Sequence, residues 1–169
     1  VFKNALEAGG SVRAITLPGG ATMGRKDIDR LGEFVKTYRA KGLAYIQMKE
    51  DGVKTALSKF LSEDEINGII ERAEANTGDL ILIVADKDEV VYQSLGALRL
   101  DLAKKYGLLE NTEEFKFAWV TEFPLLEKDE EAGRYVAAHH PFTSPMEEDL
   151  HLLDSEPGKV RAKAYDIVL

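Results

Sequence analysis

Two adjacent histidines stand out among the residues whose side chains could do chemistry. His139 and His140 are followed by residues 141–145 (PFTSP), where two prolines restrict the backbone and could fix the direction of the imidazoles. Imidazole can donate hydrogen bonds to carboxylate or phosphoryl oxygens near neutral pH. On residue chemistry alone, a structural histidine pair and a ligand-contacting pair both remain open.

A shared metal ion is not the expected use of these histidines. Adjacent residues of a strand point to opposite faces, so His139 and His140 would not both ligate one metal. A zinc site that adds His151 has no recognisable ligand spacing, although carboxylates are abundant nearby.

Asp166 is the second candidate. It lies in the otherwise apolar run 165–169 (YDIVL), where a carboxylate is paired, exposed to water or bound to a metal. Simple strand alternation, which would turn Asp166 toward water, is the alternative to a functional role.

Basic side chains gather between residues 25 and 41. Six cations stand against three acids there; the cations are Arg25, Lys26, Arg30, Lys36, Arg39 and Lys41. They could contact phosphates. The alternative is that they flank the apolar stripe of a helix as solvated side chains, with Asp29 and Glu33 between them.

Gly19, Gly24, Arg25 and Lys26 nearly match a phosphate-binding loop between a strand and a helix. Arg occupies the Lys position of that motif and Lys replaces its hydroxyl residue, and a turn before a helix explains the glycines equally well.

Composition excludes several classes of function. The absence of cysteine removes disulfides, thiolate nucleophiles and cysteine-based metal sites, and it weakly indicates a cytoplasmic protein. With 22 basic and 30 acidic residues the net charge is -8, so the chain lacks the broad basic field of a free-standing nucleic-acid binder. No apolar run is long enough to predict a membrane span.

Strands and helices alternate over residues 1–108. We expect strands at 11–17, 43–48 and 80–85, the last covered on both faces because it is continuously apolar. A first helix is expected at 26–41, with Gly42 as its C-terminal cap. A second is expected to start at the capping box Ser62–Glu65, and a third to span 88–106 and end before Gly107. This pattern predicts α/β layers, and the polar residues 110–114 are the expected boundary.

The character of the chain changes after this boundary. Residues 115–123 and 135–140 are predicted to form an antiparallel pair joined by the acidic loop 127–134, and a last strand is predicted at 162–169. These strands have no helices of their own to cover them. Because the chain starts without Met and stops inside an apolar run, we expect it to be an internal piece of a longer enzyme.

The chain resembles bacterial-type aspartyl-tRNA synthetase in three runs: 119–124 (WVTEFP), 139–145 (HHPFTSP) and 164–169 (AYDIVL). Its upstream part resembles the insertion domain of that family, the GAD domain, in the runs 12–14, 18–20, 41–46 and 96–99. The resemblance implies an α+β fold: a GAD-type insertion domain of mixed sheet with helices over residues 1–112, and antiparallel strands of a class II catalytic domain over 113–169.

The resemblance implies a parent enzyme that activates aspartate with ATP and transfers it to tRNA, with Mg²⁺ as the metal. It further implies a cytoplasmic homodimer with no membrane partner. His139 and His140 would line the aspartate and adenylate pocket. Asp166 would hold magnesium together with a glutamate beyond this chain, and Arg25, Arg30 and Arg39 are the candidate tRNA contacts.

Other parts of the family pattern are absent from the sequence. The motif-two arginine, the later Gly-rich motif and the anticodon-binding domain are missing, so the isolated chain is predicted to be inactive. Glu122 stands where many relatives have aspartate, so the role of its side chain is open. Two alternatives remain: a non-catalytic tRNA-interaction module like that of the amidotransferase subunit GatB, and a small-ligand regulatory domain with a pocket in the first 110 residues.

Overall fold

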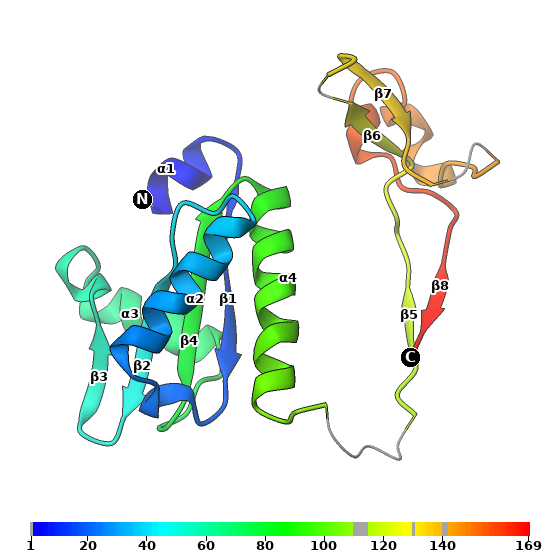
Figure 1. The fold of residues 1–169 in the computed structure, drawn as a ribbon. Helices are drawn as coiled ribbons and strands as arrows, with labels where there is room; N and C mark the ends of the chain where they lie inside the picture. Colours follow the sequence, from blue (N-terminus) through cyan, green and yellow to red (C-terminus); the bar gives the residue numbers. More distant parts are fainter. Residues whose placement is uncertain (1, 110–114, 130, 140–141) are drawn as a thin grey trace. The chain divides into compact units, whose positions relative to one another are not determined.

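The computed structural model describes residues 2–109, 115–129, 131–139 and 142–169 (Figure 1). The chain forms two compact units, residues 1–110 and 111–169. The predicted boundary between residues 112 and 113 lies outside the described residues.

The first unit is built on a four-stranded sheet with the order β1-β4-β2-β3. Its strands are β1 (Ser11–Leu17), β2 (Ala44–Lys49), β3 (Gly52–Thr55) and β4 (Leu80–Asp86). Every neighbouring pair is antiparallel, so the expectation of a mixed sheet is wrong. The physical reason is that β1 and β2, which run parallel, are separated by β4 instead of pairing with each other.

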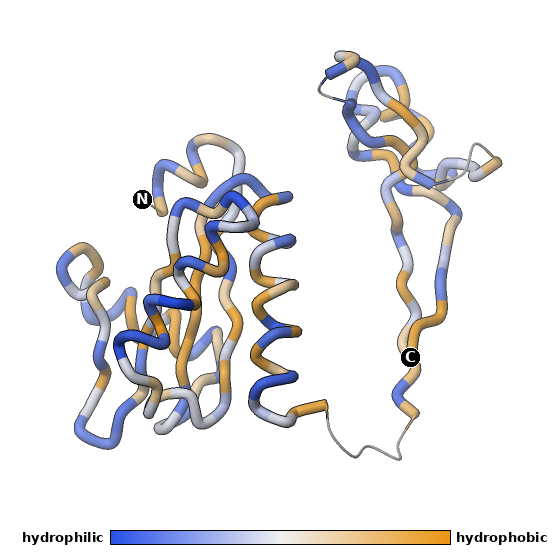
Figure 2. Tube along the Cα trace, in the orientation of Figure 1, coloured by the Kyte–Doolittle hydropathy of each residue, from blue (hydrophilic) through white to orange (hydrophobic). Residues whose placement is uncertain are grey.

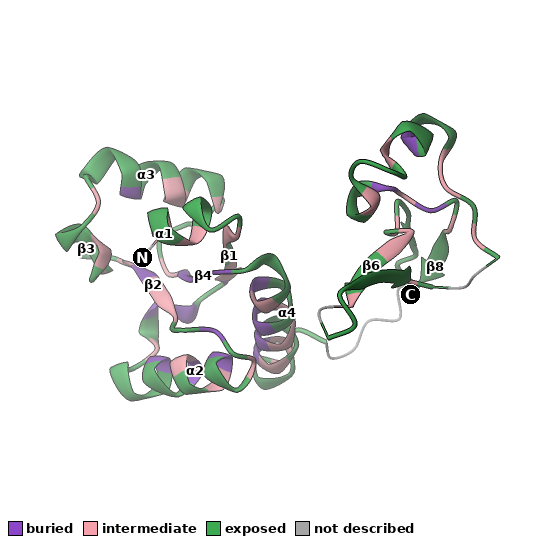
Figure 3. Ribbon diagram, turned by 90° about the horizontal axis from the view of Figure 1, so that it is seen from above, coloured by how far each residue is buried: buried purple, intermediate pink, exposed green. Residues whose placement is uncertain are grey.

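Strand β4 is buried on both faces, as its continuous apolar sequence predicts. Leu80, Leu82 and Val84 face one core, which they share with α2 (Arg25–Thr37) and α4 (Asp88–Lys105). Ile81 and Ile83 face the other core, beneath α3 (Glu63–Arg72). Helices therefore cover both faces of the sheet (Figure 3), and the α+β class is confirmed.

The predicted helices are confirmed, with one correction. Ser62 accepts a hydrogen bond from the Glu65 amide, and the Glu65 carboxylate accepts one from the Ser62 amide, which completes the capping box of α3. The C-terminal cap predicted at Gly42 is wrong, because α2 ends at Thr37 and Arg39 takes the left-handed conformation, with φ of 72°. The helix α1 (Phe2–Glu7) and the strand β3 were not expected.

The turn between β1 and α2 explains Gly19 of the near phosphate-loop motif and the neighbouring Gly20. Gly19 has φ of 70°, and its amide donates to the Asp79 carboxylate at 3.1 Å. A Cβ on Gly20 would lie 2.8 Å from the Cβ of Leu80. The buried Gln47 amide donates to the carbonyl oxygens of Ala21 and Met23, both at 3.0 Å. Close packing on β4 and β2 therefore requires this turn.

The second unit contains two separate strand pairs. β5 (Ala118–Val120) pairs with β8 (Asp166–Val168), and β6 (Leu126–Asp129) pairs with β7 (Arg134–Ala137). The predicted pairing of 115–123 with 135–140 is therefore wrong. Part of the predicted acidic loop forms β6, so β7 has a local partner and β5 pairs with the C-terminal strand instead.

The β5–β8 ribbon is exposed along its whole length. Apolar residues continue along it (Figure 2), and Trp119 and Ile167 are 63% and 56% exposed. The edge of the Trp119 ring packs against Tyr165, with the ring centroids 5.7 Å apart. A two-stranded ribbon of this kind is marginally stable without a covering surface.

No helix in the described residues is long and apolar enough to cross a bilayer.

Candidate functional site

His139 lies two residues beyond the end of β7, at the start of the segment that joins this strand to residue 142. Its imidazole is exposed, and its ring stands edge-on against the Phe123 ring with centroids 4.4 Å apart at 82°. The predicted partner His140 lies outside the described residues. The ring contact holds the His139 imidazole against Phe123.

Asp166 begins β8 and pairs in register with Val120 of β5. Its side chain is exposed and makes no hydrogen bond or ion pair within the described residues. A carboxylate in this state is available to a cation, although exposure is also what strand alternation alone predicts. His139 and Asp166 do not bond directly to each other.

A single extended segment, residues 160–163, connects the surroundings of these two residues. On one side, Leu125 donates to the Val160 carbonyl at 2.8 Å, and Ala162 donates to the Phe123 carbonyl at 2.7 Å. On the other side, Met146 donates to the Arg161 carbonyl at 2.9 Å, and Lys163 donates to Ser144 at 2.8 Å. Val160 and Ala162 are almost fully buried between these neighbours.

The two ends of the histidine loop, residues 138–144, are held by this arrangement. Ala138 donates to the Leu125 carbonyl at 3.0 Å, and the Ser144 carbonyl accepts from Lys163. The same segment continues directly into β8 and Asp166. The structure therefore attaches the histidine loop and the Asp166 strand to one central segment of the second unit.

Arg161 lies at the centre of this segment and binds three carboxylates. Its Nε and Nη2 atoms donate to the two oxygens of Asp149 at 2.8 and 2.9 Å, a bidentate pair. Its Nη1 donates to Glu122 at 2.9 Å, and a longer contact of 3.4 Å reaches Glu148. The Arg161 backbone amide also donates to Asp149, at 2.9 Å.

Asp149 is the buried partner in this cluster, at 6% exposure. Hydrogen bonds from the Arg161 side chain and backbone lower the pKa of the Asp149 carboxyl to about 2, and the same ion pair raises the pKa of Arg161 above its usual range. Both groups are therefore charged at neutral pH. The cluster holds η3 (Glu147–Leu152) against the central segment.

Glu122 has an unusual backbone conformation as well as an ion pair with Arg161. Its φ is 59°, in the left-handed region that is uncommon for a residue with a side chain. Between the pairs Val120–Asp166 and Pro124–Arg161, residues 121–123 lie opposite residues 162–165. The segment 162–165 therefore carries one extra residue. This local bulge turns the chain immediately before Phe123.

The three candidate arginines of the first unit are exposed and paired. Arg25 contacts Asp29 at 2.9 Å, Arg30 contacts Asp27 at 3.1 Å, and Arg39 lies 3.7 Å from Glu89. A hydrogen bond to Asp29 raises the pKa of Arg25. These pairs agree with the solvated-helix interpretation, and such exposed pairs are weak enough to be exchanged for phosphates.

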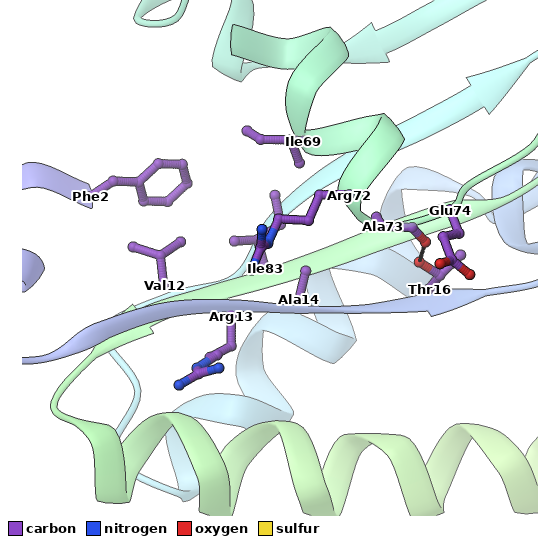
Figure 4. A pocket seen from close by; sticks show the side chains of 10 residues that line it. All are labelled: Phe2, Val12, Arg13, Ala14, Thr16, Ile69, Arg72, Ala73, Glu74 and Ile83. Atoms are coloured by element: carbon purple, nitrogen blue, oxygen red, sulfur yellow. Dashed lines mark hydrogen bonds between the residues drawn. The ribbon is translucent and has the colours of Figure 1, made fainter.

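The first unit also has a hollow of about 560 Å³ on the α3 side of β1 (Figure 4). Its walls are mainly apolar and include Phe2, Val12, Ile69 and Ile83. The Arg13 side chain points to the other face of the sheet, toward α4, where it lies over the Tyr92 ring. Thr16, Arg72 and Glu74 add polar and charged groups to its lining.

Sequence reasoning did not find the Arg161–Asp149–Glu122 cluster. These residues are distant in sequence, and each appears in an ordinary polar context. Asp149 follows Glu147 and Glu148 in an acidic stretch, so nothing in the sequence sets it apart. No group of three His, Asp or Glu side chains that could hold a metal occurs in the part of the chain that the structure describes.

Comparison with known proteins gives a consistent result over the whole chain. A family model described as the GAD domain matches residues 2–95. An aspartate–tRNA ligase of Clostridium botulinum (strain Eklund 17B / Type B) is 68% identical over 169 residues, which is 100% of this chain and 28% of that protein.

Two further aspartate–tRNA ligases show the same coverage. The protein of Clostridium perfringens (strain SM101 / Type A) is 65% identical and that of Clostridium acetobutylicum (strain ATCC 824) is 63% identical, each over 100% of this chain and 28% of the relative. The chain thus spans 28% of the length of the curated relatives that it matches.

Proposed function

The chain belongs to the GAD domain family, and from this premise we propose that it is a segment of an aspartate–tRNA ligase. The observation that carries the proposal is the identity of 63 to 68% to such ligases over all 169 residues. The match includes the second unit, which lies beyond the GAD domain match. A GAD-type module acting alone, as in the amidotransferase alternative, would not need the histidine loop.

The parent enzyme would form aspartyl-adenylate from aspartate and ATP and then transfer the aspartyl group to tRNA. In this reaction His139 and His140 would donate hydrogen bonds to the carboxylate or phosphoryl oxygens of the substrates, whose charge grows during transfer. The exposed face of the His139 imidazole supports such a contact.

Mg²⁺ would neutralise charge on the ATP phosphates when bound. Asp166 fits a magnesium ligand in its chemistry, because its carboxylate is exposed and unpaired within the described residues. One carboxylate is too few for a metal site, so the other ligands would come from the phosphates and from parts of the enzyme outside this chain.

We propose that the exposed apolar ribbon β5–β8 packs on the rest of the catalytic sheet in the parent enzyme. This packing would bury Trp119 and Ile167, which are exposed in the isolated unit. The first unit would contribute Arg25, Arg30 and Arg39 to tRNA contact. A homodimeric parent in the cytoplasm, where tRNA is charged, completes the proposal.

The test uses the full-length protein that contains this segment. We expect aspartate-dependent exchange of pyrophosphate into ATP, and a loss of about 10²-fold in kcat/KM for aspartate after His139→Ala. The control is His151→Gln, which changes an exposed histidine of η3 and should leave exchange unchanged. The isolated chain should show no exchange.

Absence of aspartate-dependent exchange in the folded full-length protein would refute the ligase proposal. Full exchange by the His139→Ala variant would instead remove His139 from the substrate pocket and leave the assignment of the enzyme intact.

A further inference from the structure

The side chain of Arg161 connects the buried part of the second unit to the histidine loop. Its guanidinium is fixed by the bidentate pair with Asp149, whose carboxylate also accepts from the Arg161 amide. A planar guanidinium held by two parallel hydrogen bonds has little freedom to move. The remaining Nη1 donor is therefore presented to Glu122 in one direction, at 2.9 Å.

Glu122 transmits this constraint to the next residue. Its left-handed backbone and the extra residue on the opposite segment turn the chain at this point. Phe123 follows directly, and its carbonyl accepts from Ala162, the neighbour of Arg161. The Phe123 backbone is thus bonded to the segment that carries Arg161.

The Phe123 ring is in turn the surface on which His139 rests, edge-on at 4.4 Å between centroids. The His139 side chain has no hydrogen-bond partner in the described part of the chain. Its direction therefore depends on this ring and on the backbone bonds that anchor the loop at Ala138 and Ser144.

We propose that Arg161 is a positioning residue for the substrate histidine: held by Asp149, it fixes Glu122 and Phe123 and thereby the direction of the His139 imidazole. This inference rests on the proposed function, and it adds residues that the sequence did not indicate. Arg161 itself would touch no reacting atom. Its effect on the reaction passes through His139.

The prediction concerns coupling and not only loss of activity. In the full-length enzyme, Arg161→Met should lower kcat/KM for aspartate-dependent exchange by about tenfold, because a small displacement of a contacting group is costly. Arg161→Lys should restore only part of it, since an ammonium cannot form the bidentate pair. In a His139→Ala background, Arg161→Met should cause no further loss.

Two additional variants keep the test decisive. Glu122→Ala leaves the Asp149–Arg161 pair in place, so this variant should fold even if Arg161→Met does not, and its loss should likewise vanish in the His139→Ala background. Lys163→Met is the matched control, because the Lys163 side chain lies on the same segment but binds only the exposed Glu147, at 2.9 Å, and the substitution keeps the backbone bond to Ser144. It should retain the kcat/KM of the unmodified enzyme.

The outcomes separate the two proposals. Arg161 does not position His139 if Arg161→Met and Glu122→Ala lower kcat/KM by the same factor with and without His139. The same conclusion follows if neither variant lowers kcat/KM. If Lys163→Met loses as much, a general charge effect replaces the positioning role. An unmodified enzyme without aspartate-dependent exchange refutes the proposed function itself.

Discussion

In the second unit, a charged side chain, Asp149, is buried together with the apolar Val160 and Ala162. Asp149 is almost completely buried, and the large apolar residues nearby, such as Leu150 and Leu153, remain partly exposed. A buried carboxylate is stable only when it is fully hydrogen-bonded, and here the Arg161 side chain and amide supply those bonds. The Asp149–Arg161 pair therefore stabilises this unit only while Asp149 is ionised.

This dependence predicts how the second unit responds to acid. The folded pKa of Asp149 is about 2, below the value of about 3.9 for an unfolded Asp. The stabilisation is therefore fully present above about pH 4 and is lost as the pH falls from about 4 to about 2. We expect the urea midpoint of this unit to fall as the pH falls over that range. The fluorescence of Trp119, the only tryptophan of the chain, measures the unfolding transition.

The matched variants are Asp149→Asn and Asp154→Asn. Asp149→Asn should lower the urea midpoint at pH 7 and flatten its acid dependence, because the charge that titrates is gone. Asp154 is exposed and belongs to no ion pair in the described ranges, so its variant should behave like the unmodified chain. An unchanged acid response in Asp149→Asn would show that other carboxylates control the transition.

At the level of elements, α4 shows that burial, and not residue type, decides how much a side chain contributes to stability. Leu98 is fully buried in the core between α2, α4 and the sheet, whereas Leu100 on the same helix is 56% exposed. Both are leucines in the helix interior, so their intrinsic helix preferences are equal. Their different environments come only from the face on which each lies.

We therefore expect different costs from the same substitution. Leu98→Ala should lower the free energy of unfolding of the first unit by about 2 to 5 kcal/mol, because it removes buried methyl groups and leaves a cavity. Leu100→Ala should change it by less than about 0.5 kcal/mol. Urea unfolding followed by circular dichroism at 222 nm measures both.

The Trp119 signal in the same samples provides the control. Since Leu98 and Trp119 belong to different compact units, the fluorescence transition should not move in Leu98→Ala. Equal losses for the two leucine variants would mean that the buried face of α4 is assigned incorrectly.

On the scale of the whole molecule, the distribution of charge matters more than its total. The net charge is -8, which opposes approach to a polyanion, but the surface of α2 carries arginines in weak exposed pairs. A phosphate could replace Asp27 or Asp29 as the partner of these cations at little cost. Contact with tRNA would therefore be local and sensitive to salt.

Neutralising Arg25, Arg30 and Arg39 with glutamine in the full-length protein should weaken tRNA binding. Each lost phosphate contact reduces the slope of log affinity against log salt by about 0.7 to 0.9, so the slope should become shallower by about 2 to 3. Filter binding at several salt concentrations measures this slope.

The charge-matched control replaces Lys49, Lys54 and Lys59 with glutamine. These residues lie on or beside β2, β3 and the turn at Leu57–Lys59, and their variant should keep the slope of the unmodified protein. Identical slopes in all three proteins would remove α2 from the tRNA surface.

The sequence by itself determined the elements whose signals are local. The period of Ile28, Leu31 and Val35, the capping box at Ser62 and the continuous apolar run of β4 each predict one element correctly, because helix periodicity, capping and two-sided burial act over a few residues. The histidine pair and Asp166 were also identifiable as candidates from their unusual neighbours.

Only the tertiary structure decided which elements pair and which side chains meet. The sequence does not show that β4 inserts between β1 and β2, that β5 pairs with β8, or that Arg161 joins Glu122 and Asp149. These contacts join residues far apart in the chain. Which strands pair and which side chains meet depends on the packing free energy of the complete unit. Every local pattern contributes to this free energy, but no single pattern determines it.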